Sequence, residues 1–212
     1  MIAELPPVAI PGHRSSGQGS PDHPLRVLTR GVAGLAGGGW DPEVRADVTW
    51  MFDALAPEWH TRTSPERTAV VRDALDRGGV TGGAVAVEVG SGIGTYSPLL
   101  ADRFATVAAV DLSIAMLRRS PPGPGQRIRA DGADLPVRAG AADAVVLVNA
   151  FLFPREVDRV LAPGGRLVWV NISGEGTPIH LPADEVRSVL PGDWRGVASR
   201  AGQGTWCVLW RA

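Results

Sequence analysis

The sequence predicts an α/β fold: a mostly parallel, seven-stranded sheet with helices on both faces and a helical extension on its N-terminal side. Strand and helix patterns alternate from residue 84 onward, as in parallel sheets joined by helical crossovers. Several expected strands contain continuous apolar runs, such as 144–148, which suit strands covered on both faces. Residues 195–211 are predicted to form two antiparallel strands joined near residues 202–204.

The beginning of the chain gives weaker signals. Residues 1–24 are rich in proline, glycine and serine, so we expect them to be mobile unless something pins them. Residues 25–39 contain scattered apolar side chains and receive no assigned element. We therefore treat residues 1–40 as a flexible N-terminal extension or lid.

Two helices are expected within residues 41–78. The first begins at Asp41, whose carboxylate can cap the helix, with a proline at the first helical position. The pair Ser64-Pro65 repeats this start signal, and the pair Gly78-Gly79 ends the second helix.

The remaining elements follow in order. Strands are expected at 84–89, 106–111, 126–130, 143–149 and 165–172. Helices are expected at about 96–103, 113–119 and 154–161. Together with the two preceding helices they make residues 41–212 one domain, in a chain of 212 residues that is long enough to bury a core.

The composition gives no positive sign of several classes of partner. The net charge of −1 gives no sign of a nucleic-acid or acidic-membrane partner. No stretch approaches the roughly 20 apolar residues needed to cross a bilayer, and the first residues do not resemble a signal peptide. The single cysteine, Cys207, can form no intrachain disulfide and fits a reducing cytoplasm, which is the expected location.

The main candidate site is a glycine-rich loop that follows the strand at 84–89. Its sequence, from Gly90 to Gly94, has the pattern G-x-G-x-G. Such glycines allow a sharp turn and a close approach of the backbone to a ligand. The dinucleotide pattern G-x-G-x-x-G would need a further glycine at Thr95, so a nicotinamide site is disfavoured.

Three acidic residues add chemical detail to this loop. Glu88, just before it, suits a cationic ligand group such as an ammonium. Asp111 ends the next strand, where a carboxylate can accept hydrogen bonds from a ribose diol. Asp131 follows the third strand and can accept a hydrogen bond from an exocyclic amine such as that of adenine. Ligands of such sheets lie outside the carboxyl ends of the strands, where these residues gather.

These motifs, in this order and spacing, resemble those of the Rossmann-like class I S-adenosylmethionine-dependent methyltransferases over about residues 50–172. The small-molecule branch that includes the ubiquinone and menaquinone methyltransferases is most similar. The segment Arg159 to Gly165 also resembles the family's approach to its fifth strand, and Asn149 lies where the family lines the methionine end of the cofactor. Trp59-His60 stand where the family more often has Tyr-Asp.

The resemblance implies that the chain binds S-adenosyl-L-methionine and releases S-adenosyl-L-homocysteine. The implied cofactor-binding residues are Trp59, Glu88, Gly90, Gly92, Gly94, Tyr96, Asp111, Leu112, Asp131, Gly132 and Asn149. For Tyr96, contact with the acceptor instead of the cofactor is an open alternative.

Methyl transfer is an in-line displacement, so the enzyme must mainly align two reactants, and no metal or covalent step is required. A general base is needed only for a protonated, weakly nucleophilic acceptor. His60 and His180 are the candidate catalytic residues, with surface or loop positions as the alternative for each. Phe151 and Phe153 are candidates for the acceptor pocket, with core packing as their alternative.

One departure from the family concerns the short connection between Asn149 and Arg159, where the family usually fits an additional helix. We hypothesise that residues 12–50 form a lid that replaces this wall, or that a second subunit of a homodimer does.

The expected function is therefore methyl transfer from S-adenosylmethionine to an oxygen or nitrogen atom of a small molecule. Three alternatives stay open: a cofactor-binding enzyme of the same fold with different chemistry, a non-catalytic binding partner, and a protein or RNA methyltransferase. The residues after Asn149 read Ala-Phe-Leu, unlike the Asn-Pro-Pro-Tyr-type motif of base methyltransferases, which argues against methylation of exocyclic amines in nucleic acid.

Overall fold

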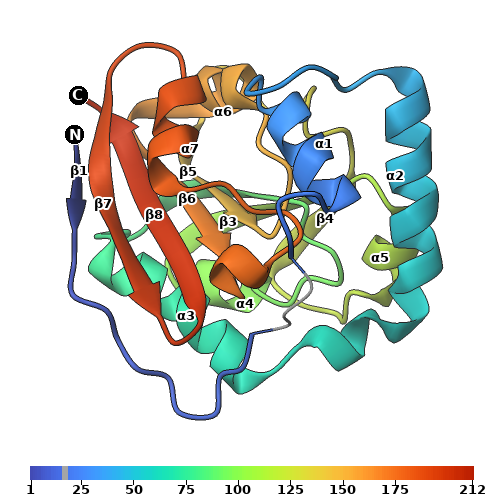
Figure 1. Cartoon of the computed structure of the whole chain (residues 1–212), viewed down its shortest axis with the longest axis horizontal. Coiled ribbons are helices and arrows are strands. Elements are labelled where there is room, and N and C mark those ends of the chain that lie inside the picture. The colour runs from blue at the N-terminus through green and yellow to red at the C-terminus, as the bar shows by residue number, and fades with distance from the viewer. Residues whose placement is uncertain (16–18) are drawn as a thin grey trace.

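One eight-stranded sheet forms the centre of the molecule (Figure 1) in a computed structural model that describes residues 1–15 and 19–212. The strand order is β1-β7-β8-β6-β5-β2-β3-β4. The strands are β1 Ile2–Glu4, β2 Gly83–Val89, β3 Phe104–Asp111, β4 Gly125–Arg129, β5 Ala142–Val148, β6 Leu161–Asn171, β7 Trp194–Ala201 and β8 Gly204–Arg211.

The mostly parallel sheet predicted from the sequence is confirmed. Strands β4, β3, β2, β5 and β6 are parallel neighbours, and β8 runs antiparallel between β6 and β7. The eighth strand is β1, which pairs in parallel with β7 and which sequence analysis did not assign. Its three residues are too few to show a strand period.

The helices begin largely where the sequence signals place them. They are α1 Pro24–Val32, α2 Pro42–Leu55, α3 Pro65–Arg77, α4 Ser97–Ala101, α5 Ile114–Arg119, α6 Pro154–Val160 and α7 Ala183–Val189, with 3₁₀ turns η1 Ala56–Arg62 and η2 Gly174–Gly176. Asp41 accepts a hydrogen bond from the Val44 N–H at 2.9 Å, and Ser64 accepts one from the Arg67 N–H at 3.3 Å. Helix α1 lies in the stretch that received no assignment, and α4 is shorter than the expected 96–103.

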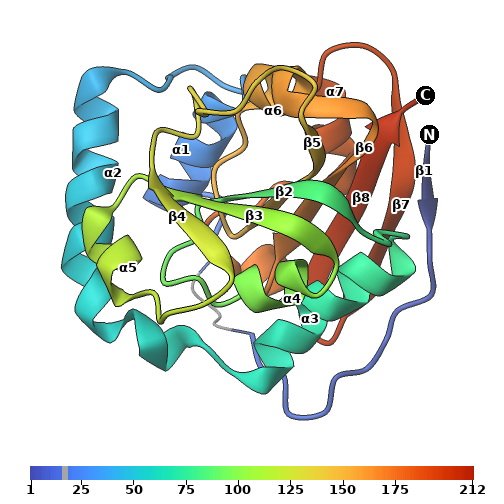
Figure 2. The same ribbon diagram turned by 180° about the vertical axis from the view of Figure 1, so that it is seen from behind.

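Each face of the sheet has its own hydrophobic cluster. On one face, α3 and α4 contribute side chains such as Val71 and Leu100, which cluster with Trp206 of β8. On the other, α6 and α7 contribute Val157 and Val186, with the apolar side of α1 packed beside them. Figure 2 shows α3 and α4 together on one side of the sheet. The continuous apolar strands are explained by this two-sided burial.

The described part of the N-terminal stretch lies along the β7 edge of the sheet. The Leu5 and Val8 N–H groups donate to the Ala198 and Arg200 carbonyls at 2.8 and 2.9 Å. The Nδ1 atom of His13 accepts a hydrogen bond from the Gln203 N–H at 3.2 Å. The sequence predicts that this stretch is mobile unless contacts hold it in place, and these hydrogen bonds are such contacts. Residues 16–18 of the stretch lie outside the described residues. Within the described ranges, no helix has both the length and the apolar character needed to cross a membrane.

A partly buried hydrogen bond joins α3 to β8 of the sheet. The indole N–H of Trp206, a residue that is 2% exposed, donates to Asp73 Oδ2 at 2.8 Å. Asp73→Ala leaves that donor without its partner, so we expect the free energy of unfolding to fall by about 1–3 kcal/mol in urea titrations.

The matched control for this prediction is Asp76→Ala on the same helix. Asp76 pairs with Arg103, but its side chain is 54% exposed. Exposed ion pairs stabilise proteins by less than about 1 kcal/mol. Equal losses in the two variants would contradict a special role for the Asp73–Trp206 hydrogen bond.

Candidate functional site

A cavity of about 910 Å³ opens at the carboxyl ends of β2, β3, β5 and β6. This volume is near the upper end of the roughly 300–1,000 Å³ that small-molecule sites occupy. Loops after these strands form its floor, while α1, α2 and η1 contribute the opposite wall. The lining residues from the floor include Gly90, Gly92, Asp111, Leu112, Gly132, Asn149, Phe151, Phe153, Thr177 and Ile179.

The glycine loop turns sharply from β2 toward α4. Gly90, Gly92 and Gly94 all have positive φ, at 69°, 57° and 73°. A Cβ on Gly90 would lie 2.7 Å from the Ala150 Cβ, and one on Gly92 would lie 3.3 Å from Trp59 Nε1. Conformation and space therefore both require glycine at Gly90. Gly90 and Gly92 line the cavity, whereas Gly94 lies behind the loop near Ser120 and does not.

Asp111 fixes this loop to the end of β3. Its Oδ2 accepts the Gly92 N–H at 2.7 Å, and its Oδ1 accepts the Ser113 N–H at 2.8 Å. Burial raises the pKa of Asp111, and the two backbone hydrogen bonds act in the opposite direction. The structure thus places Asp111 and the following Leu112 in the cavity wall beside Gly92.

Glu88 does not face the cavity, contrary to the sequence-based expectation that its carboxylate meets an ammonium. The residue is 2% exposed, and its Oε2 accepts a hydrogen bond from Ser97 Oγ at 2.5 Å. Burial raises the pKa of Glu88 to about 7, which the Ser97 hydrogen bond opposes and nearby Asp111 reinforces. Its side chain joins β2 to the first residue of α4 beneath the loop, because strand alternation turns it inward.

The carboxylate of Asp131 also differs from the sequence-based expectation, because its hydrogen-bond partners belong to the protein itself. Both of its oxygens contact the Trp40 indole N–H, at 2.9 and 3.0 Å, and Oδ1 also accepts the Ala133 N–H at 2.9 Å. Arg45 approaches Oδ2 at 3.4 Å. The neighbouring Gly132 lines the cavity, whereas Asp131 itself does not.

Asn149 holds an uncommon backbone conformation at the end of β5. Its φ is 51°, the only positive value at a non-glycine position among the described residues. The side-chain Oδ1 accepts the Ile172 N–H at 2.9 Å, which ties the ends of β5 and β6 together. Such conformations concentrate at functional sites, and Asn149 lines the cavity here together with Tyr96.

Aromatic side chains form much of the remaining lining. The Trp40 ring packs against Phe153 with centroids 5.2 Å apart in an edge-on arrangement, and against Phe151 at 5.7 Å. Trp59 packs edge-on against Phe52 at 5.8 Å. All five rings line the cavity, so the structure brings Phe151, Phe153 and Trp59 together around one space.

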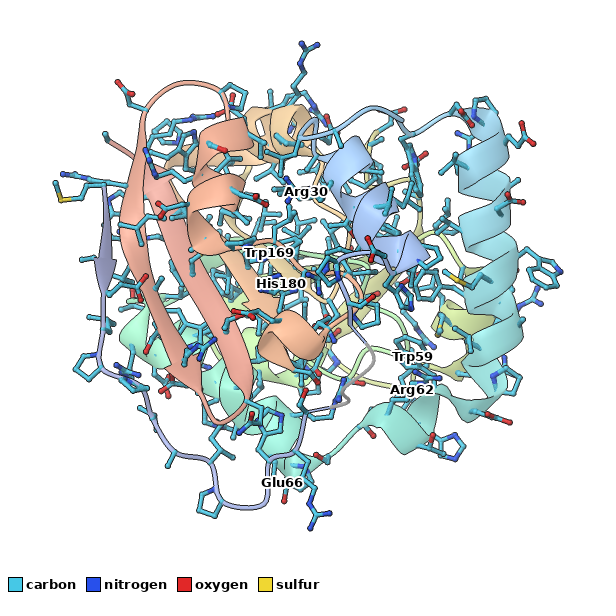
Figure 3. The ribbon with its side chains drawn as sticks, viewed as in Figure 1. Arg30, Trp59, Arg62, Glu66, Trp169 and His180 are labelled. Atoms are coloured by element: carbon cyan, nitrogen blue, oxygen red, sulfur yellow. The ribbon has the colours of Figure 1, made fainter. Side chains whose placement is uncertain are left out.

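Neither candidate catalytic histidine reaches the cavity. His60 is exposed on η1 and does not line it. His180 is 5% exposed, and burial together with nearby Arg26 lowers its pKa to about 4. Figure 3 shows His180 in the interior, well apart from Trp59. The catalytic assignments of both histidines are therefore not supported, because one is turned to solvent and the other lies behind the cavity wall.

The cavity also contains residues that sequence analysis missed. His23, at the start of α1, accepts the Leu25 N–H on Nδ1 at 3.1 Å, so its neutral ring carries the proton on Nε2. Arg67 of α3 has a buried Nε with no hydrogen-bond partner in the described part of the chain. The guanidinium carbon of Arg62 lies 5.4 Å from the centroid of the Trp59 ring, and Figure 3 labels both residues. No sequence motif marks these residues, since only the tertiary fold brings them together.

Within residues 1–15 and 19–212, no group of three or more His, Cys, Asp or Glu side chains is placed to hold a metal ion.

The burial of Glu88 predicts a pH dependence. A carboxyl whose pKa is about 7 in the folded state and 4.5 otherwise binds its proton more tightly when folded. Its contribution to stability is therefore complete below about pH 4.5 and is lost as pH rises through 7. Relative to Glu88→Gln, the wild-type free energy of unfolding should fall between pH 5 and pH 8, by at most on the order of 3 kcal/mol. A constant difference between the two proteins across urea titrations at these pH values would contradict this assignment.

The region that contains the glycine loop is similar to a known protein family. A family model described as a methyltransferase domain matches residues 87–169, less than half of the chain. That range runs from the end of β2 through β6 and so contains the glycine loop, Asp111 and Asn149. No curated protein matches the chain.

Several solved structures share the fold. The DhpI–SAH complex matches at 18% identity with a TM-score of 0.62, over 77% of this chain and 95% of that one. A SAM-dependent methyltransferase from Aquifex aeolicus matches at 16% identity with a TM-score of 0.57, over 80% and 97%. A chain from a complex of the Haloferax volcanii Trm112 methyltransferase activator matches at 24% identity, but its TM-score is 0.49 and only 59% of its length is covered.

The similarity to DhpI and to the Aquifex aeolicus protein shows the fold. Residues 87–169 of this fold match the model of a methyltransferase domain.

Proposed function

We propose that this protein transfers a methyl group from S-adenosylmethionine to an oxygen or nitrogen atom of a small molecule bound in the cavity. The main support is that the glycine loop and Asp111 share one cavity of about 910 Å³ with a group of aromatic side chains. We call the part of the cavity lined by Trp40, Phe151 and Phe153 the aromatic compartment. A cavity of this size offers room for a cofactor and a second molecule side by side, which is what an in-line displacement requires.

Residues of the cavity fit the three parts of the cofactor. The ribose diol would lie at Asp111, with adenine along Leu112 and Gly132. The methionine end would extend past Gly90 toward Asn149 and Tyr96. Space at Gly90 supports close approach, since a Cβ there would collide with Ala150.

Arg67 is the proposed partner of the cofactor's carboxylate. Its Nε is buried and has no hydrogen-bond partner among the described residues, while another part of the guanidinium is hydrogen-bonded to Tyr96. A buried N–H without a partner costs free energy. The guanidinium lies close enough to Tyr96 to oppose the effect of burial on the tyrosine pKa, so it stands at the proposed methionine end. An incoming carboxylate would satisfy this donor.

The acceptor compartment is apolar and aromatic, with one notable polar residue. Because His23 Nδ1 already accepts the Leu25 N–H, the neutral ring can donate from Nε2 but cannot act as a base there. We therefore propose that the chain acts mainly by alignment and by excluding water. The acceptor, an ionised oxygen or a neutral amine nitrogen, attacks the methyl carbon in line with a lone pair, the carbon–sulfur bond breaks, and the bonding electrons stay on sulfur. An amine acceptor releases its surplus proton to solvent after the transfer.

Finer assignments remain proposals as well. The aromatic lining supports an apolar acceptor, such as those of the ubiquinone and menaquinone methyltransferase branch. A cytoplasmic location and a homodimer stay predictions from sequence. Formation of S-adenosylhomocysteine with a panel of aromatic hydroxyl and amino compounds tests the function, and cofactor binding without turnover on any acceptor class would favour different chemistry on the same fold.

Asp111→Ala should weaken binding of S-adenosylhomocysteine by about 1–3 kcal/mol, because the ribose loses a hydrogen bond to a charged group. Calorimetric titration measures this directly. Asp134→Ala, a change at an exposed aspartate, is the control and should leave the affinity unchanged. An unaltered affinity in Asp111→Ala would show that the ribose is placed wrongly.

Arg67→Ala should weaken S-adenosylhomocysteine binding by about tenfold or more, the scale of a charge-assisted hydrogen bond. It should leave the affinity for 5′-methylthioadenosine nearly unchanged, since that nucleoside lacks the amino-acid group. Equal losses for both ligands would place Arg67 away from the carboxylate.

A further inference from the structure

The cavity is covered by what we call the lid segment, residues 40–55, which consists of Trp40, its short link and α2. Helix α2 contains only one buried side chain, that of Val48. Figure 1 shows this helix at the edge of the molecule, far from β7 and β8. Apolar side chains including Trp40 and Phe52 pack against the core, and polar contacts at the two ends of the segment further fix its position.

The first contact is at Trp40. Its indole N–H is shared between the two carboxylate oxygens of Asp131 at 2.9 and 3.0 Å, and Arg45 from the first turn of α2 lies 3.4 Å from the same carboxylate. The Trp40 ring meanwhile packs on Phe151 and Phe153. One carboxylate therefore fixes both the ring and the start of α2.

The second contact is near the other end of α2. Asp53 Oδ1 accepts a hydrogen bond from Ser113 Oγ and another from the Ala115 N–H at 3.3 Å. Ser113 follows directly after Asp111 and Leu112. Both ends of the lid segment are thus attached to residues adjacent to the proposed ribose and adenine contacts.

Both carboxylate oxygens of Asp131 are occupied by contacts within the protein, mainly with the lid segment. Oδ1 is occupied by Trp40 and by the Ala133 N–H at 2.9 Å, and Oδ2 by Trp40 and Arg45. Gly132 lines the cavity while Asp131 does not. The geometry favours an action of Asp131 on the ligand through Trp40 over a direct contact with adenine.

We propose that Asp131 and Trp40 are positioning residues that hold the lid segment closed over the adenine end of the cofactor, so that cofactor affinity depends on their hydrogen bond. This inference rests on the proposed function, in which the ligand is S-adenosylmethionine. A ligand that binds the closed lid more tightly loses apparent affinity when the closed state is less populated. By linkage, the bound ligand must also stabilise the closed lid.

A double-mutant cycle tests the coupling. Trp40→Phe keeps an aromatic ring and removes the N–H, while Asp131→Ala removes the acceptor. Each should weaken S-adenosylhomocysteine binding severalfold in calorimetry, and the double variant should be no weaker than Asp131→Ala alone. Asp47→Ala, at an exposed residue of the same helix that does not line the cavity, is the matched control and should bind normally.

Hydrogen exchange gives a readout that a loss of general stability would not produce. Amides of residues 42–55 should exchange faster in Trp40→Phe, while those of α3 should be unchanged. Saturating S-adenosylhomocysteine should slow exchange of residues 42–55 in the wild type more than in the variant.

The possible failures are distinct. If S-adenosylhomocysteine does not bind the wild-type protein, the proposed function is contradicted. If it binds and Trp40→Phe changes neither affinity nor exchange, or if the effects of the two substitutions multiply in the double variant, the positioning role is contradicted while the proposed function stands.

Discussion

The hydrogen bond from the Gly92 N–H to the Asp111 carboxylate, at 2.7 Å, is the contact on which the site depends. It joins the loop after β2 to the end of β3, two strands that the parallel register aligns from Gly83 to Val89. The positive φ angles of the loop glycines make the contact sterically accessible. Backbone geometry, strand register and the half-buried carboxylate of Asp111 together create the surface on which we propose the cofactor lies.

Local sequence signals predicted this part of the site well. Glycines at fixed spacing after a strand, and an acid at the end of the next, act through backbone conformation and strand direction, which neighbouring residues largely determine. The same holds for the starts of α2 and α3, where Asp41 and Ser64 cap as expected. Side-chain direction at Glu88 was missed because the acid was interpreted by its position in the motif, whereas strand alternation buries it against Ser97.

The other differences arise from tertiary contacts. Neither His60 nor His180 reaches the cavity, while Arg67 and His23 do, and each outcome depends on how distant elements pack. Strand β1 and helix α1 had no periodic signal long enough to identify them, yet both are held by contacts with the sheet or with the loop after β6. Arg26 of α1, for example, donates to the Pro178 and Thr177 carbonyls at 3.1 and 2.6 Å.

A crystal structure of the protein with S-adenosylhomocysteine would test the central claim most directly. We predict density along Gly90 and Gly92, with the ribose hydroxyls within hydrogen-bond distance of Asp111 and the carboxylate at Arg67. The homocysteine sulfur should face the aromatic compartment bounded by Phe151. A ligand bound elsewhere, or a ribose out of reach of Asp111, would contradict the account.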